Sequence, residues 1–132
     1  MMKSTFAAIF SLIILTLTGN TLAADPQSFL KLYAAEAKEA PSAQKGGKFF
    51  SEKHGNEWSC SSCHGMPPIG EGKHASTNKV IAPLAPAFNA ERFTDDAKVE
   101  KWFKRNCNDV VGRSCTASEK SDVLAYLISL KK

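Results

Sequence analysis

Two cysteines and a histidine lie within five consecutive residues of this 132-residue chain, as Cys60-Ser61-Ser62-Cys63-His64. Two thiols about one helical turn apart can form thioether bonds with the two vinyl groups on one edge of a porphyrin. The next residue then places an imidazole where it can bind the iron as a neutral base. The C-x-x-C-H pattern therefore predicts one covalently attached haem c, held by Cys60 and Cys63, with His64 as an axial ligand.

Two other uses of a paired-cysteine motif compete with haem attachment. A redox dithiol of the thioredoxin type would lie in a βαβ pattern, and none is found here. A four-cysteine zinc site would need a second close pair, but Cys107 and Cys115 are eight positions apart. Both uses fit the sequence less well than haem attachment, and a chance match to a short motif is the remaining alternative.

The opposite face of the iron needs its own ligand, which in ordinary c-type cytochromes is a methionine. Two of the three methionines open the chain in a predicted signal segment, and Met66 follows His64 by only two residues, which keeps it on the His64 side. His54 and His74 are candidates, and His74 could reach the iron on a long loop. Histidines beside a lysine, as both of these are, are more often simply solvated.

Asn106 is a further candidate, because helical spacing places it on the apolar face of its segment. It follows Trp102 by four residues and Phe103 by three. These two aromatic residues and Phe88 are expected to form a dry surface on the distal side. A polar amide on a buried face needs a partner, and an iron atom is one such partner. The alternative is an ordinary helix residue that bonds nearby backbone, and the spacing alone leaves both open.

The first 23 residues have the pattern of a cleaved secretory signal. Lys3 gives a positive start, an apolar run follows over residues 6–17, and small residues precede a cleavage site after Ala23. The run is short for a membrane span, although an uncleaved anchor is the competing interpretation. We therefore expect an exported domain over residues 24–132, in the periplasm, with no stable membrane insertion after cleavage.

Export would place the four cysteines in an oxidising compartment, where disulfides persist. Cys107 and Cys115 are then expected to form a disulfide that closes a short loop next to Asn106. The bond would either support the backbone beside a weak ligand or simply stabilise a small exported domain. Without Lys3 the formal net charge of +4 falls to +3. This small excess does not predict nucleic-acid binding and weakly favours an acidic partner.

Helical patterns near both ends of the exported chain should position these residues. We expect a helix over residues 25–40 that Asp25 caps and whose apolar stripe contains Phe29, Leu32 and Tyr33. A second helix is expected over 42–53, a third that Thr94 caps, and a last that begins near Thr116 in a capping box. Residues 54–92 lack periodicity and are expected to be irregular. A stretch of this length is typical of a functional loop, of chain that wraps around something that is not protein, or of a wrong assignment of its elements. The expected fold class is all-α, with a thin core completed by the haem.

The order of these features resembles the class I cytochrome c fold, in which the N- and C-terminal helices cross around a covalently attached haem. Here the crossing would bring Gly46 or Gly47 against Tyr126, because a glycine lets another backbone approach closely. The helix over residues 25–40 would be an addition to that fold.

A more specific resemblance covers residues 49–127. It rests on the haem motif, the sequence LAPA at residues 84–87, the pair Asn106-Cys107 and Cys115, which occur in this order. These features are similar to those of the SHP (sphaeroides haem protein) family of oxygen-binding monohaem cytochromes c.

That family has His/Asn haem ligation, so the resemblance implies that His64 and Asn106 are the two axial ligands. It also implies that Asn106 leaves the iron on reduction, that O2 or NO can then bind, and that a dihaem cytochrome c is the redox partner. Residues 25–40 lie outside the stretch that carries the resemblance, and their helix would either dock a partner or cover the core.

Three functions are compatible with the sequence. The first is a periplasmic electron-transfer cytochrome that binds small ligands at ferrous iron, and the second is a plain six-coordinate electron shuttle. The third is a reductase of O2, NO or hydroxylamine, which needs a proton donor near the iron; Lys73, His74 and Arg105 are nominal candidates. The lack of a usable methionine favours the first over the second, and an electron carrier that binds ligands is favoured over a dedicated enzyme.

Overall fold

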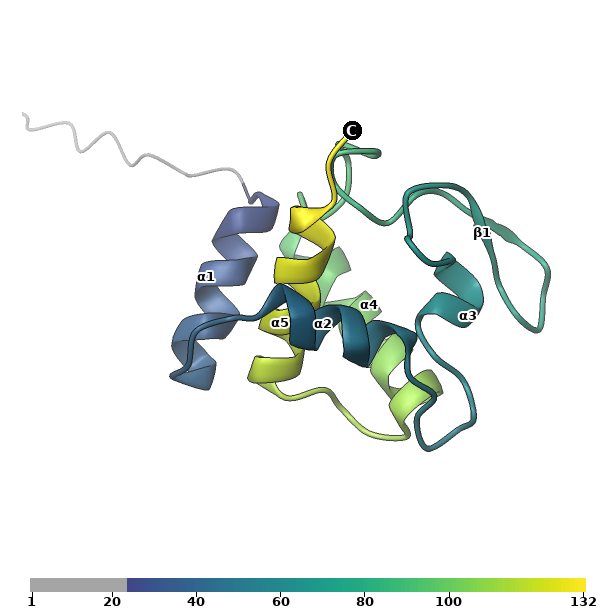
Figure 1. Cartoon of the computed structure of the whole chain (residues 1–132), viewed down its shortest axis with the longest axis horizontal. Helices are drawn as coiled ribbons and strands as arrows, with labels where there is room; N and C mark the ends of the chain where they lie inside the picture. The colour runs from purple at the N-terminus through teal and green to yellow at the C-terminus, as the bar shows by residue number, and fades with distance from the viewer. Residues whose placement is uncertain (1–23) are drawn as a thin grey trace, which may run out of the picture.

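The computed structural model describes residues 24–132, so the predicted signal over residues 1–23 lies outside the described part. Five helices and two short strands make up the described chain (Figure 1). Their bounds are α1 Pro26–Ala37, α2 Ala43–Ser51, α3 Ser61–His64, β1 Gly72–Lys73, β2 Val80–Ile81, α4 Asp96–Val111 and α5 Ala117–Ser129. The expected all-α class is confirmed, and no helix in this part is long and apolar enough to cross a membrane.

The helices begin at residues whose side chains satisfy the first free backbone N–H groups. Asp25 caps α1, and Thr116 caps α5 in a capping box with Glu119, as the sequence predicts. Helix α4 differs from the prediction, because its N-cap is Asp95 and not Thr94. The Asp95 carboxylate accepts the backbone N–H three residues later at 2.9 Å. A carboxylate also suits the positive end of the helix dipole better than a hydroxyl does.

Helix α5 is the centre of the core, and both α1 and α2 pack against it (Figure 1). Phe29 and Tyr33 of α1 pack with Leu124 of α5 and with Val99 of α4. The predicted apolar stripe of α1 is wrong at Leu32, which is 56% exposed. Helix α1 therefore covers the core through two aromatic side chains, which pack against both α4 and α5.

The predicted crossing of α2 and α5 is confirmed at two glycines. A Cβ on Gly46 would lie 1.9 Å from the backbone oxygen of Asp122, and a Cβ on Gly47 would lie 3.2 Å from the Tyr126 ring. The close approach lets Phe50 of α2 reach a buried cluster of α5 side chains. Since a side chain at position 46 would overlap backbone, the crossing depends on glycine there.

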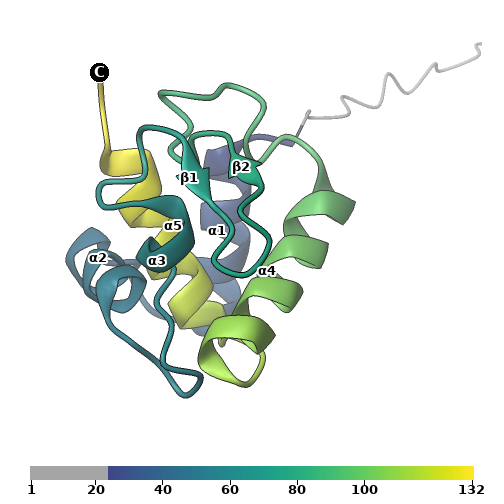
Figure 2. The ribbon, with the colours of Figure 1, turned by 90° about the vertical axis from the view of Figure 1, so that its right-hand side faces the viewer.

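The segment between α2 and α4 is mostly irregular, as predicted, but it contains the short helix α3 and two short strands. Strands β1 and β2 pair antiparallel, with Gly72 opposite Ile81 and Lys73 opposite Val80. Figure 2 shows this hairpin beside α3, with α2 and α4 on opposite sides of the molecule. Strands of two residues are too short to show an alternating pattern, which is why the sequence does not predict them.

Candidate functional site

The C-x-x-C-H motif forms a single helical turn, α3. The backbone N–H of His64 donates to the carbonyl of Cys60 at 3.1 Å, which brings both cysteines and the histidine onto one short element. Ser59 and Ser62 fix the start of this turn by exchanging backbone-to-hydroxyl hydrogen bonds at 3.0 and 3.1 Å. Local hydrogen bonding alone therefore places the three residues side by side.

Strand β1 packs directly against this turn. A Cβ on Gly72 would lie 2.0 Å from the carbonyl oxygen of Cys63 and 3.0 Å from the Cα of His64. Only a glycine permits backbone to approach backbone this closely. The hairpin thus holds α3 in place through direct contact between the two backbones.

Two ionisable groups of the motif, His64 and Cys60, are held in their neutral forms. Burial, together with the positive charge of Arg92, lowers the pKa of His64 to about 4. Burial raises the pKa of the Cys60 thiol to about 11. The Nδ1 atom of His64 is buried and has no hydrogen-bond partner among residues 24–132. A neutral imidazole beside two thiols in an apolar setting fits the donor set that a covalent haem requires.

Two adjoining cavities open beside α3. The smaller, of about 150 Å³, is lined by Cys60 and Cys63 and mainly by apolar side chains of α2, α4 and α5. The larger, of about 540 Å³, has a more polar lining. His64 and Asn106 line both cavities. The structure therefore brings the predicted proximal and distal residues, which lie more than forty positions apart in the sequence, to the same two cavities.

Asn106 lies within α4 and not at its end, and its side chain is only partly buried. In the described part of the chain its carboxamide takes part in no side-chain hydrogen bond. The Asn56 and Asn89 carboxamides, by contrast, donate to backbone carbonyls at 3.0 Å and 3.3 Å respectively. The local backbone bond that was the alternative interpretation of Asn106 is thus not seen. Its carboxamide remains available to a group in the cavities.

His74 lines both cavities, so it stays close to the site. Its Nδ1 accepts the backbone N–H of Thr77 at 3.3 Å. His74 therefore has a local hydrogen-bond partner, which the Asn106 carboxamide lacks in the described part of the chain.

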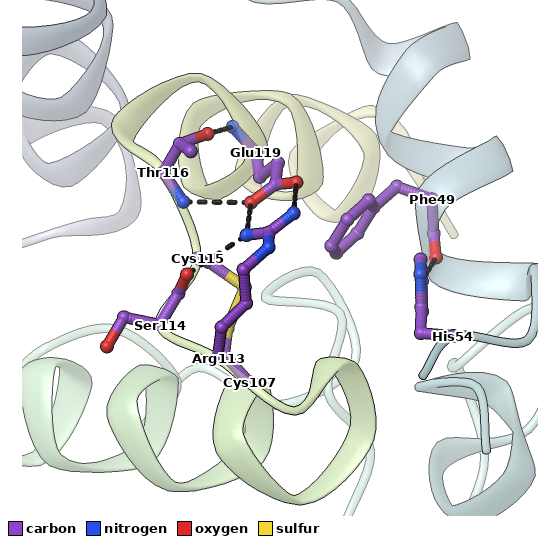
Figure 3. A network of polar contacts seen from close by, with 8 residues as sticks. All are labelled: Phe49, His54, Cys107, Arg113, Ser114, Cys115, Thr116 and Glu119. Carbon is purple, nitrogen blue, oxygen red and sulfur yellow. Dashed lines mark hydrogen bonds and ion pairs between the residues drawn. A yellow bond between two sulfur atoms is a disulfide. The ribbon is translucent and has the colours of Figure 1, made fainter. Parts of the chain in front are cut away.

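His54 lines neither cavity. Its Nε2 lies 2.7 Å from the carbonyl oxygen of Phe49, and since a carbonyl only accepts, the ring nitrogen must donate (Figure 3). The ring also packs against the Phe49 ring in a tilted arrangement, with centroids 4.4 Å apart. Both contacts give His54 a structural role in ending α2.

The other side chains named from the sequence divide between the site and the surface. Trp102 and Phe103 line the smaller cavity, although Trp102 is 46% exposed and so marks its edge. Phe88 lines neither cavity, so its predicted place on the distal side is wrong; its backbone N–H instead belongs to a turn of the 85–89 loop. The Met66 sulfur accepts the Tyr126 hydroxyl at 3.2 Å, outside both cavities.

Sequence reasoning missed several residues that line the cavities, among them Arg92, Phe93 and Leu84. They come from the aperiodic segment before α4. Only their residue types, a basic group and two large apolar groups in a Pro-rich loop, could have suggested a role. Of the nominal proton donors, Arg105 lines the larger cavity and Lys73 lines neither.

The C-terminal half of α4 is tied to its surroundings next to Asn106. In the structure the sulfurs of Cys107 and Cys115 are bonded, and Cys107 is buried. The connection that follows is ordered by Arg113, whose guanidinium donates two hydrogen bonds to the Glu119 carboxylate at 2.7 and 2.8 Å (Figure 3). Arg113 and the N–H of Thr116 lower the pKa of Glu119. The loop after α4 is thus held at both of its ends.

Comparisons with known proteins agree with this site. Residues 36–127 match a family described as a domain of unknown function, DUF1924. The chain is 43% identical over 124 residues to the cytochrome c-type protein SHP of Cereibacter sphaeroides, covering 89% of this chain and 95% of that protein. It is 46% identical over 98 residues to cytochrome c'' of Methylophilus methylotrophus, covering 71% of this chain and 68% of that protein.

Solved structures of both relatives share the fold. Oxidised SHP, described as an oxygen-binding cytochrome c, matches with a TM-score of 0.76 and 40% identity over 82% of this chain and 99% of its own. Oxidised cytochrome c'' matches with a TM-score of 0.75 and 40% identity over 81% and 95%. Matches of this extent span nearly the whole described part, so α1 belongs to the shared fold. The chain is therefore a member of the SHP and cytochrome c'' family, the all-α, class I-like cytochromes with one covalently bound haem c.

Proposed function

We propose that this protein is a periplasmic monohaem cytochrome c that transfers electrons and binds a small ligand such as O2 or NO. Asn106 would hold the distal side of the ferric haem through its carboxamide oxygen and would leave on reduction, which opens that side to the ligand. The observation that carries the proposal is that Asn106 shares both cavities with His64, while its carboxamide makes no hydrogen bond within the described chain.

The attachment side follows from α3. Cys60 and Cys63 would form the two thioether bonds, and His64 would be the proximal ligand. Burial keeps the imidazole neutral at neutral pH, since the pKa of His64 is lowered to about 4. The haem supplies the iron whose ferric and ferrous states differ in their affinity for hard and soft donors. The short helix and the close contact at Gly72 would keep His64 in place in both states.

On the distal side of the haem, the chemistry of an amide explains why Asn106 could leave the iron. A neutral carboxamide oxygen is a hard and weak donor, which suits ferric iron better than ferrous iron. Phe103 and Val99 line the smaller cavity beside Asn106 and keep its surroundings apolar. Distal polarity and access decide whether a haem protein binds a ligand, activates it or only transfers electrons. An apolar distal side with a weak protein ligand favours reversible binding of a neutral diatomic molecule.

The descriptions of two relatives, one concerning oxygen binding and one concerning haem-ligand detachment, support this proposal. The solved structure of oxidised SHP is that of an oxygen-binding cytochrome c. A solution structure of cytochrome c'', with a TM-score of 0.73 and 40% identity, is described as giving insights into the structural basis of haem-ligand detachment. Ligand binding and ligand detachment are thus both associated with this fold.

Electron transfer would take place with a dihaem cytochrome c that has an acidic docking surface. Trp102 is exposed at the edge of the smaller cavity, and the cationic groups of Lys101 and Arg105 each lie 5.6 Å from its ring centroid. An aromatic side chain flanked by cations is typical of interfaces with acidic partners. Periplasmic localisation rests on the predicted signal over residues 1–23 and on the C-x-x-C-H motif.

The decisive experiment replaces the proposed distal ligand. In the holoprotein, Asn106→Ala should leave the haem attached, change the ferric absorption spectrum from low spin toward high spin, and accelerate azide binding to the ferric protein. The wild-type protein should bind NO when reduced. Absorption spectroscopy of the oxidised and reduced protein, with and without NO, measures all of these changes.

Asn108→Ala is the matched control, because it removes an exposed carboxamide from the same helix two residues away. It should leave the ferric spectrum and the azide rate unchanged. An unaltered ferric spectrum in Asn106→Ala would instead assign the distal side to His74 or another residue. If the ferrous protein stays low spin and its spectrum does not change when NO is added, the protein is a plain six-coordinate shuttle. If it steadily consumes O2, NO or hydroxylamine, it is a reductase.

A further inference from the structure

The two cavities differ in the charge of their linings. The larger cavity is lined by most of the charged groups near the site: Lys79, Glu91, Arg92, Asp95, Lys98 and Arg105. Cys60 and Cys63 line only the smaller cavity. On a haem the two propionate carboxylates project from the side of the porphyrin that lies away from the thioether bonds. A haem attached at Cys60 and Cys63 would therefore present its carboxylates toward the larger, charged cavity.

Arg92 differs from the other two arginines of the chain in its partners. Arg105 pairs with Asp109 at 3.7 Å, and Arg113 pairs with Glu119 at 2.7 Å. Arg92 has no carboxylate within ion-pair distance among residues 24–132. Its Nε and Nη2 donate instead to the backbone carbonyls of Pro83 and Ala82, at 2.9 and 2.6 Å. These two bonds fix the plane of the guanidinium and leave its other N–H groups without a partner in the described chain.

Arg92 is also the arginine for which an unpaired charge costs most. Its side chain is partly buried, and burial is the main cause that lowers its pKa, whereas Arg105 and Arg113 are exposed. Removing a cation from water is unfavourable unless an anion compensates it. Two carbonyl dipoles compensate a full charge only in part. The arrangement therefore indicates an anion that does not come from the polypeptide.

We propose that Arg92 binds a propionate carboxylate of the haem, an inference that rests on the proposed attachment at Cys60 and Cys63. A guanidinium held by two carbonyls is pre-organised to offer its remaining N–H groups to a carboxylate. Arg92 would then be a positioning residue for the cofactor, and its cationic charge would offset the propionate charge near the iron. The loop over residues 82–92 would be linked to the haem through this one side chain.

The test compares Arg92→Gln with the wild-type holoprotein. Loss of the partner should shift the propionate bending band in the resonance Raman spectrum. It should also make the midpoint potential more negative, because an uncompensated carboxylate favours the ferric state. Arg92→Lys keeps the charge but loses the planar guanidinium, so it should shift the propionate band with a smaller change in midpoint potential. This variant replaces Arg92→Gln in the test if Arg92→Gln does not fold.

Lys98→Gln is the matched control, because it removes the same charge from the lining of the same cavity. Its amine is exposed and pairs with Asp95 at 3.6 Å. The control should leave the propionate band in place. An unchanged band in both Arg92 variants would overturn the proposal and show that Arg92 only supports the loop, even if stability falls. A haem found by peptide mass on residues other than Cys60 and Cys63 would overturn the attachment as well, so the two failures are distinguishable.

Discussion

The two sides of the haem site are supported in different ways. On one side His64 belongs to the same short helix as both cysteines of the motif, and β1 packs directly on that helix at Gly72. On the other side Asn106 belongs to α4, which is held through the disulfide that follows it and through contacts with α1. The first support is local and continuous, and the second is assembled from distant segments.

This difference matches the roles that we propose for the two residues. Neighbouring residues in one helical turn cannot move apart without unfolding the turn, so His64 is suited to permanent ligation. Tertiary contacts can be weakened one at a time, so a side chain on α4 is suited to a ligand that leaves and returns. If the comparison is correct, substitutions on the two sides should separate haem attachment from distal ligation.

Gly72→Ala should have the largest effect, on the His64 side. The new Cβ would overlap the Cys63 carbonyl oxygen at 2.0 Å. Neither atom can rotate away, because the carbonyl is backbone and the position of a Cβ is fixed by the backbone. We expect a loss of about 3 kcal/mol in the free energy of unfolding, measured by denaturant titration of the holoprotein. Gly70→Ala is the control, because its Cβ would meet nothing within 4 Å. Equal losses in the two variants would contradict the tight packing of β1 on α3.

Replacing both Cys107 and Cys115 by serine should have the next largest effect, on the Asn106 side. The disulfide spans eight positions, and a loop of that size stabilises by about 2.5 kcal/mol in the chain-entropy account. The haem should stay attached while azide binds the ferric protein faster than in the wild type. A loss of thermal stability with unchanged azide kinetics would mean that the bond only stabilises the domain and does not support distal ligation.

Tyr33→Phe should act more weakly on the same side. The Tyr33 hydroxyl donates to Glu100 of α4, and the Tyr33 ring packs edge-on against Phe103 at a centroid distance of 5.7 Å. Removing the hydroxyl should cost about 1 kcal/mol and slightly accelerate azide binding. Tyr126→Phe removes the same group beside Met66 on the His64 side, and it should leave azide binding unchanged. The same acceleration in both variants would remove the distinction between the two sides.

The smallest expected effect is a pH dependence at the end of α4. The Arg113 guanidinium holds the pKa of Glu119 below its usual value, so the pair stabilises the fold above the unfolded pKa of about 4.3 and loses this effect as pH falls through the lower folded pKa. Arg113 is exposed, so the contribution should be below about 1 kcal/mol. Glu119→Gln should be less stable than the wild type at pH 7, and the gap should narrow below pH 4 in thermal unfolding curves.

The parts of the fold that the sequence predicts are those set by neighbouring residues. The capping box at Thr116, the N-cap at Asp25 and the helical turn of the haem motif all follow from local spacing, and the structure has each of them. The crossing at Gly46 and Gly47 involves distant segments, yet it was predictable because adjacent glycines destabilise a helix unless another backbone packs closely against them.

The parts that the sequence does not predict depend on tertiary placement. Phe88 is aromatic and close in sequence to the distal helix, but its loop turns it away from both cavities. Arg92 belongs to no sequence pattern, because the role that we propose for it depends on its being half-buried without a carboxylate partner among residues 24–132. Trp102 satisfies the helical period but is exposed, since the period fixes a face of the helix and not what covers that face.

The separation of the four cysteines into a bonded pair and the pair that we propose for haem attachment has a consequence for how the protein is made. Four thiols that oxidise completely can pair in three ways, and each of these consumes both Cys60 and Cys63. We therefore expect thioether formation to precede full oxidation of the exported chain, while α3 is still accessible. In the folded structure Cys60 and Cys63 are half-buried and form no disulfide, whereas Cys107 and Cys115 are joined. The finished molecule thus requires Cys60 and Cys63 to stay as free thiols until the cofactor is attached, whereas the Cys107–Cys115 bond does not compete with that step.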